Sequence, residues 1–150
     1  MKVRFATEKD LDQLTNLRSS FALFEQKYLP QSSIKNNNLL KKETKELLAK
    51  KDTKFLVAEE DKILGYLNFF IYSEFKDKIF VGELFVEPAA RRKGIANMLF
   101  EKLIRWTKDH DRKIIRLNVA KLNKKAIKFF KRMGFDKFES DYLSLEKSLD

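Results

Sequence analysis

The chain has 150 residues, 32 Lys/Arg against 22 Asp/Glu, a formal net charge of +10, one histidine and no cysteine. This length fits a single domain over residues 1–150, and the absence of cysteine excludes disulfides, thiolate metal sites and a cysteine nucleophile. A lone histidine, His110, cannot build a histidine-rich metal site, so we expect no metal cofactor. No apolar stretch reaches the roughly 18 residues of a membrane span and no signal-peptide core is present. These features predict a soluble, cytoplasmic protein without a membrane partner.

The N-terminal half reads as a strand, two helices and a hairpin of strands. Thr7, with Asp10 three residues later, is typical of a helix N-cap with a capping box, and apolar residues recur after it at helical spacing. A turn-rich stretch around Pro30 separates this helix from a second, amphipathic helix. The expected elements are a strand at 2–6, helices at 11–24 and 39–49, and strands at 55–58 and 63–72.

The C-terminal half alternates strands and helices. We expect a strand at 79–86, a helix from 95 to about 108, a strand at 113–119, a helix at about 123–133 and a last strand at 135–145. Gly134 is expected to end the fourth helix in a left-handed conformation. The resulting order, βααβββαβαβ, predicts an α/β (α+β) fold with a mixed central sheet and helices on both faces.

The segment from Leu84 to Ala96 has the features of an anion-binding loop. A strand breaks at Pro88, three cations follow, and Gly94 precedes a helix. The unpaired N–H groups of a helix N-terminus and its dipole favour phosphate, and a glycine lets a ligand approach the backbone. Neither a Walker A loop nor the dinucleotide fingerprint is present. The segment therefore predicts a site for a phosphorylated cofactor.

The Arg-x-x-Gly-x-Ala arrangement from Arg91 to Ala96 closely resembles the acetyl-CoA loop of the GNAT superfamily of acyl-CoA-dependent N-acyltransferases. The segment 123–135 is similar to that family's asparagine-to-Gly-Phe segment, and 3–11 to its first strand and helix. The resemblance spans most of the chain and is weakest over 19–51. It implies a GNAT-like fold and direct transfer of acetyl, from acetyl-CoA as co-substrate, to a primary amine of a small molecule, a protein N-terminus or a lysine.

The resemblance also implies which residues bind the co-substrate. In the family two central strands splay apart, the pantetheine arm lies between them, and a strand N–H stabilises the oxyanion that forms as the amine attacks. Asn123 would contact this arm in addition to capping its helix. Phe130 stands where many members carry a tyrosine that protonates the leaving thiolate. The residues expected at the cofactor are Leu84, Phe85, Val86, Arg91, Arg92, Lys93, Gly94, Ile95, Ala96, Asn97, Asn123 and Phe130.

Glu83 is the candidate general base, because it is an acid within an apolar strand, immediately before the backbone that would bind the thioester. Burial favours the neutral carboxyl group and so makes the carboxylate a better acceptor of an ammonium proton, through water. A carboxylate at a strand edge or a salt-bridge partner of a lysine is the alternative interpretation, and Glu87, nearer solvent, is the weaker rival base. Since phenylalanine donates no proton, the thiolate would depend on water or another hydroxyl. The tyrosines considered for this step are Tyr66, Tyr72 and Tyr142.

The distribution of charge leaves other functions open. Residues 91–132 contain 15 Lys/Arg and 3 Asp/Glu, so all the excess positive charge lies there. This charge would attract the phosphates of CoA and would also suit a nucleic acid. Nucleic acid is the less expected partner, because Phe129, Phe130 and Phe135 fall where a core needs apolar groups rather than on an exposed stacking surface. A non-catalytic acyl-CoA sensor remains an alternative, the amine acceptor is not specified, and a homodimer is compatible with the sequence.

Overall fold

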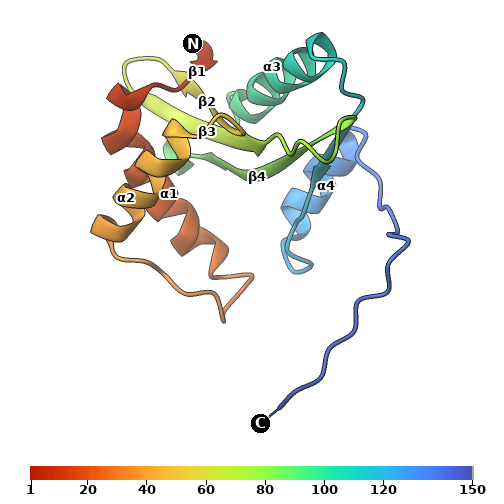
Figure 1. Cartoon of the computed structure of the whole chain (residues 1–150). Coiled ribbons are helices and arrows are strands. Elements are labelled where there is room, and N and C mark those ends of the chain that lie inside the picture. Colours follow the sequence, from red (N-terminus) through yellow and green to blue (C-terminus); the bar gives the residue numbers. More distant parts are fainter. Residues whose placement is uncertain (150) are drawn as a thin grey trace. The chain divides into compact units, whose positions relative to one another are not determined.

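The computed structural model describes residues 1–149, which divide into Met1–Asn118 and the segment from Val119 onward. The first unit is built on one five-stranded sheet, in the order β1-β2-β3-β4-β5 (Figure 1). Its first four strands are antiparallel neighbours, and β5 joins β4 in parallel. Its elements are β1 (Lys2–Phe5), the 3-10 turn η1 (Glu8–Asp10), α1 (Leu11–Glu25), α2 (Asn37–Ala49), β2 (Thr53–Glu59), β3 (Ile63–Phe70), β4 (Lys78–Val86), the 3-10 turn η2 (Pro88–Ala90), α3 (Ile95–Asp109) and β5 (Ile114–Leu117).

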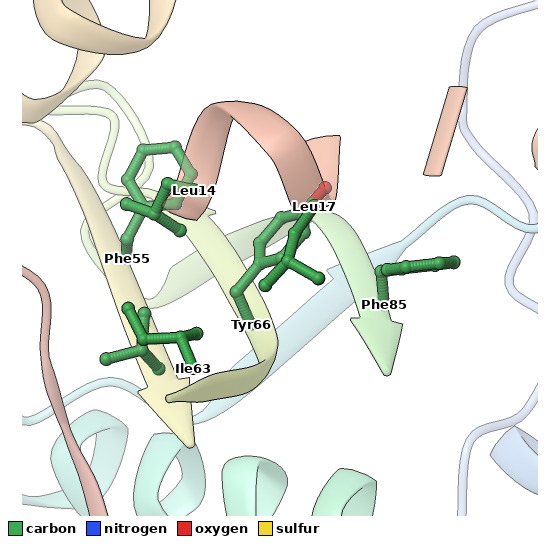
Figure 2. Packing of buried hydrophobic residues seen from close by; sticks show 7 residues of the cluster. Leu14, Leu17, Phe55, Ile63, Tyr66 and Phe85 are labelled. Carbon is green, nitrogen blue, oxygen red and sulfur yellow. The ribbon is translucent and has the colours of Figure 1, made fainter. Parts of the chain in front are cut away.

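The prediction of a mixed sheet with helices on both faces is confirmed. Helices α1 and α2 pack against one face and α3 against the other (Figure 1). On the first face Leu14 and Leu17 of α1 pack with Phe55, Tyr66 and Phe85 of the strands, all of them buried (Figure 2). Leu14 and Leu17 lie three positions apart on α1, which is a spacing that gives a helix one apolar face.

The capping box expected at Thr7 is present and joins the first strand to the first helix. The Thr7 N–H donates to Asp10 Oδ2 at 2.8 Å. The guanidinium of Arg4 donates to Asp10 at 2.8 Å and to Glu59 at 2.7 Å. Hydrogen bonds from Arg4 lower the pKa of Asp10. This ion-paired cluster therefore fixes β1 against both η1 and β2.

Strand β4 contains a bulge at Gly82. Asn68 lies opposite Glu83 and Phe69 opposite Val81, so Gly82 has no partner on β3. A Cβ atom at Gly82 would lie 2.6 Å from the ring of Phe70 and 2.8 Å from Asn68 Oδ1. The Asn68 oxygen accepts the Glu83 N–H at 2.6 Å. The bulge therefore requires the close approach that glycine allows, and it re-aims the second half of β4.

The segment from Val119 onward contains α4 (Lys124–Arg132). As expected, Asn123 caps this helix by accepting the Ala126 N–H at 3.1 Å, and Gly134 ends it with a φ of +94°. The last strand predicted at 135–145 is wrong: within residues 135–149 there is no helix or strand. Polar residues interrupt this run, and Ser140 Oγ accepts the Tyr142 N–H at 3.1 Å. Such local side-chain bonds compete with strand pairing.

Candidate active site

The edge of β4 that faces β5 is only half paired. The parallel ladder runs from Lys78 to Val81 on β4, whereas β4 itself continues to Val86. At the far end the Glu87 N–H donates to Leu64 O of β3 at 2.8 Å. Because hydrogen-bonding directions alternate along an antiparallel strand, the amides of Leu84 and Val86 point to the side without a strand partner, and that of Phe85 points to β3. The ladder with β5 thus ends at Val81, and the amides of Leu84 and Val86 have no strand partner on that side in residues 1–149.

Arg91 ties the loop after β4 to this open edge. Its Nε donates to the carbonyl oxygen of Val86 at 3.0 Å. Its guanidinium carbon lies 4.8 Å from the ring centroid of Phe24 and 5.5 Å from that of Phe85. These two contacts are within the range of cation–π attraction. Arg91 therefore positions the loop through the strand and α1.

The loop between η2 and α3 forms a concave stretch of backbone. Arg92 has a φ of +67° and Gly94 a φ of +76°, with Lys93 between them. When right-handed and left-handed backbone conformations alternate along a turn, successive N–H groups point to the same side. Such a concave turn can bind an anion. Gly94 is the N-cap of α3, and in the described structure no side chain caps this end. The first-turn amides, including those of Ala96 and Asn97, are therefore available to a ligand, while buried Ile95 anchors the turn to the sheet.

Glu83 is held by two side chains from other elements. Its Oε1 accepts from Arg18 Nε at 3.1 Å and from the Tyr66 hydroxyl at 2.8 Å, and its Oε2 accepts from Arg18 Nη2 at 3.4 Å. The third guanidinium nitrogen of Arg18, Nη1, donates to Thr44 Oγ1 of α2 at 2.7 Å. A carboxylate offers about four acceptor sites, so Oε2 keeps capacity for a water molecule or an amine. The ion pair that sequence reasoning considered exists, with an arginine in place of a lysine.

Two residues of this network, Arg18 and Thr44, escaped the sequence analysis. Arg18 lies 65 residues before Glu83, so spacing gives no sign of the pair. One signal was present: Arg18 falls on the apolar stripe of α1, four residues after Leu14, where a cation needs a buried partner. Burial would lower the pKa of Arg18, and the hydrogen bonds with Glu83 outweigh it, so that the pKa is raised.

The structure gives the contacts of three other candidate proton carriers: Tyr66, Tyr72 and Glu87. Tyr66 is fully buried, and burial followed by the charge of Glu83 raises its pKa well above 10, so it remains a neutral donor to Glu83. Tyr72 stacks on Phe70 with parallel rings. Glu87 pairs with Lys62 at 3.3 Å on the surface. None of these contacts assigns a proton donor for the thiolate.

Asn123 and Phe130 belong to the segment from Val119 onward. The Asn123 side-chain oxygen is used by its cap, which leaves its NH2 group for other partners. The half-buried ring of Phe130 meets Phe129 and Phe135 edge to face, at 5.4 and 5.7 Å between centroids. Their contact with a cofactor stays a prediction.

Neither a metal centre nor a membrane segment is found in residues 1–149. No group of three or more His, Asp or Glu side chains in that range is arranged to hold a metal ion. No helix in the same range is both long and apolar enough to cross a membrane.

The mixed sheet, the β4 edge that is unpaired beyond Val81 and the uncapped helix after a basic loop belong to a fold that is also found in solved acetyltransferase structures. The crystal structure of a possible acetyltransferase from Clostridium difficile 630 is similar, with a TM-score of 0.77 and 23% sequence identity. The superposition covers 99% of this chain and 97% of the chain of that structure. AAC(6')-Iy, solved with the bisubstrate analogue CoA-S-monomethyl-acetylneamine, matches 98% of both chains with a TM-score of 0.72 and 18% identity. At sequence identities of 23% and 18%, these matches establish similarity of the fold only.

Sequence comparison identifies the family of the protein. The profile of the acetyltransferase (GNAT) family matches residues 13–135, and the chain belongs to this family. An uncharacterised N-acetyltransferase of Methanocaldococcus jannaschii is 42% identical over 59 residues, which are 39% of this chain. The matched stretch spans only 26% of that relative.

Proposed function

We propose that the protein transfers the acetyl group of acetyl-CoA to a primary amine. The observation that carries this proposal is the continuity of two features: the free edge of β4 at Leu84 and Val86 leads directly into the uncapped N-terminus of α3. A ligand with an amide-rich arm and a diphosphate would meet both features in that order. Family membership supports acyl transfer.

The residues present fit such a ligand. Gly94 has no atom within 4 Å of the position where a Cβ would stand, so the approach to its backbone is open. The α3 amides and the concave turn would hold the diphosphate, and exposed Arg92 and Lys93 add positive charge nearby. When bound, acetyl-CoA supplies the activated acyl group as a thioester. The Leu84 and Val86 edge would hold the arm, and an N–H there would stabilise negative charge on the thioester oxygen.

We infer that Glu83 removes the proton of the attacking amine. Its carboxylate is 24% exposed, precedes the free strand edge by one residue, and keeps acceptor capacity on Oε2. Tyr66 and Arg18 hold it in one orientation. A water molecule at Oε2 would carry the proton, as in other general-base reactions.

Calorimetric titration with acetyl-CoA, together with release of free thiol in the presence of a panel of primary amines, tests the proposal. Saturable binding and amine-dependent thiol release are expected. Binding without release for any amine would favour the sensor alternative. Absence of binding would overturn the proposal.

The Gly94→Ala variant is expected to lower the affinity for CoA by about tenfold. Its methyl group would occupy the open approach to the turn, and a φ of +76° is strained for alanine by about 1–2 kcal/mol. Gly134→Ala is the matched control, because its φ of +94° imposes a similar strain and its Cβ also meets nothing within 4 Å. Calorimetry with CoA should show a loss in the first variant alone. Equal affinities in both variants would exclude this turn as the phosphate site.

A further inference from the structure

A cavity of about 160 Å³ lies between α1, the loop before α2 and β4. Its lining combines apolar side chains and three serines with charged groups from different elements. The residues that matter for its chemistry are Arg18, Phe21, Glu25, Ile34, Lys35 and Glu83. Because Glu83 lies in its wall, the cavity adjoins the proposed site of acyl transfer.

One of the two carboxylates that line this cavity has no ion-pair partner within the described part of the chain. The guanidinium of Arg18 is engaged by Glu83 and Thr44. Lys35 is engaged by Glu43, with 2.6 Å between Nζ and Oε2. In the described structure the carboxylate of Glu25, which is half-buried, makes no hydrogen bond and no ion pair. The carboxylate of Glu25 therefore lines the cavity beside the proposed base without an ion-pair partner among residues 1–149.

We propose that this cavity binds the second ammonium group of an acceptor that carries two primary amines, with Glu25 as the specificity residue. This inference rests on the proposed function. A single cation would neutralise Glu25, and the aliphatic linker would lie along Phe21 and Ile34. The substrate class is thus an aliphatic diamine or a longer polyamine.

Glu25 is suited to the amine that does not react. An adjacent carboxylate favours the charged form of an amine, whereas the nucleophile has to lose its proton before it attacks. Arg18 and Tyr66 already bind Glu83, which adjoins the free β4 edge, so the reacting amine belongs there, and the ammonium that stays charged belongs at the unpaired Glu25. The volume also agrees, because a cavity of about 150 Å³ accommodates a molecule of six heavy atoms such as benzene.

The physical state of Glu25 supports this arrangement. Burial, followed by repulsion from Glu83, raises the pKa of Glu25. A carboxylate with a raised pKa destabilises the fold when ionised, so its contribution to stability is lost as the pH rises through that pKa. The groups facing it are Glu83 on β4, Arg18 on α1 and Lys35 on the loop. A bound ammonium would relieve this repulsion.

Matched acceptors and variants test the proposal. The probes are butylamine and three diamines, 1,3-diaminopropane, 1,4-diaminobutane and 1,5-diaminopentane. In the wild type we expect kcat/KM for the best diamine to exceed that for butylamine by about tenfold, as for a charge pair that contributes about 1.4 kcal/mol. In Glu25→Gln the ratio should fall to about 2, the statistical factor for two amines, mainly through KM. Glu46→Gln, which removes an exposed carboxylate from α2, should keep the wild-type ratio.

Direct binding separates this inference from the proposed function. Calorimetry of the same diamines with the wild type, Glu25→Gln and Glu46→Gln should show weaker binding in Glu25→Gln alone, whether or not acetyl-CoA is bound. Failure of acetyl-CoA to bind would remove the proposed function and leave this measurement intact. A wild type without preference for diamines, or equal diamine binding by all three proteins, would overturn the inference.

As a second readout, Glu25→Gln should be slightly more stable than the wild type at pH 7, and this gain should vanish at a pH where Glu25 is protonated.

Discussion

Substitution of Arg18 by methionine is expected to lower the free energy of unfolding by about 3 kcal/mol. The guanidinium is 9% exposed and joins three elements: α1 that carries it, α2 through Thr44 and β4 through Glu83. Methionine fills a similar volume, so the loss comes mainly from the charge and the hydrogen bonds. The substitution removes the guanidinium partner of the partly buried Glu83 carboxylate and leaves Tyr66 as its remaining side-chain donor. Removal of one partner of a buried ion pair is costly because the other charge is left without compensation.

Urea denaturation of Arg18→Met, Glu83→Gln and the double variant measures this effect. The double variant should be more stable than Arg18→Met alone, because it no longer contains an uncompensated carboxylate. Lys41→Met is the control, since Lys41 pairs with Asp12 at 2.9 Å on the surface, and such exposed pairs contribute little. If the two single effects added to within about 0.5 kcal/mol, the pair would not be coupled.

Local signals predicted most of the fold. Thr7 and Asp10 form the expected capping box, and Gly134 and Asn123 end and begin α4 as expected. Each of these features depends only on residues within one helical turn, so neighbouring positions in the sequence are enough to predict it. Helix α2 begins at Asn37, two residues before the predicted start at 39, because the side chain of Asn36 accepts the Leu39 N–H at 2.9 Å and caps the helix there.

Features that depend on distant partners were less accessible. The last strand was predicted from the apolar residues of 135–145, but a strand needs a neighbouring edge as well as a pattern, and that segment has no strand partner in residues 1–149. The bulge at Gly82 follows from contacts with Asn68 and Phe70 on β3, which the sequence does not reveal. The network around Glu83 likewise joins four elements that are far apart in the chain: α1, α2, β3 and β4. The prediction of Glu83 as a site residue came from its position, whereas Arg18, Thr44 and Glu25 required the structure.

Glu83→Gln is expected to lower kcat by about 100-fold with little change in the affinity for acetyl-CoA. Glutamine preserves the shape and can still accept from Tyr66 and Arg18, but it cannot take a proton. Turnover is measured by thiol release under saturating acetyl-CoA, with calorimetry to confirm binding and circular dichroism to confirm folding. Glu87→Gln, made in parallel, tests the rival base, which pairs with Lys62.

The pH profile distinguishes a base from a residue that only supports the fold. Without Glu83 the reaction would depend on amine that is already neutral in solution, so the rate of Glu83→Gln should continue to rise as the pH approaches the pKa of the free amine. A purely structural role would lower the rate by the same factor at every pH and would leave the shape of the profile unchanged. Because Glu83→Gln also leaves Arg18 without its ionic partner, some stability will be lost, and rates have to be compared at a temperature where both proteins are folded. A wild-type profile in Glu83→Gln, combined with a changed one in Glu87→Gln, would transfer the role of base to the carboxylate at the end of β4.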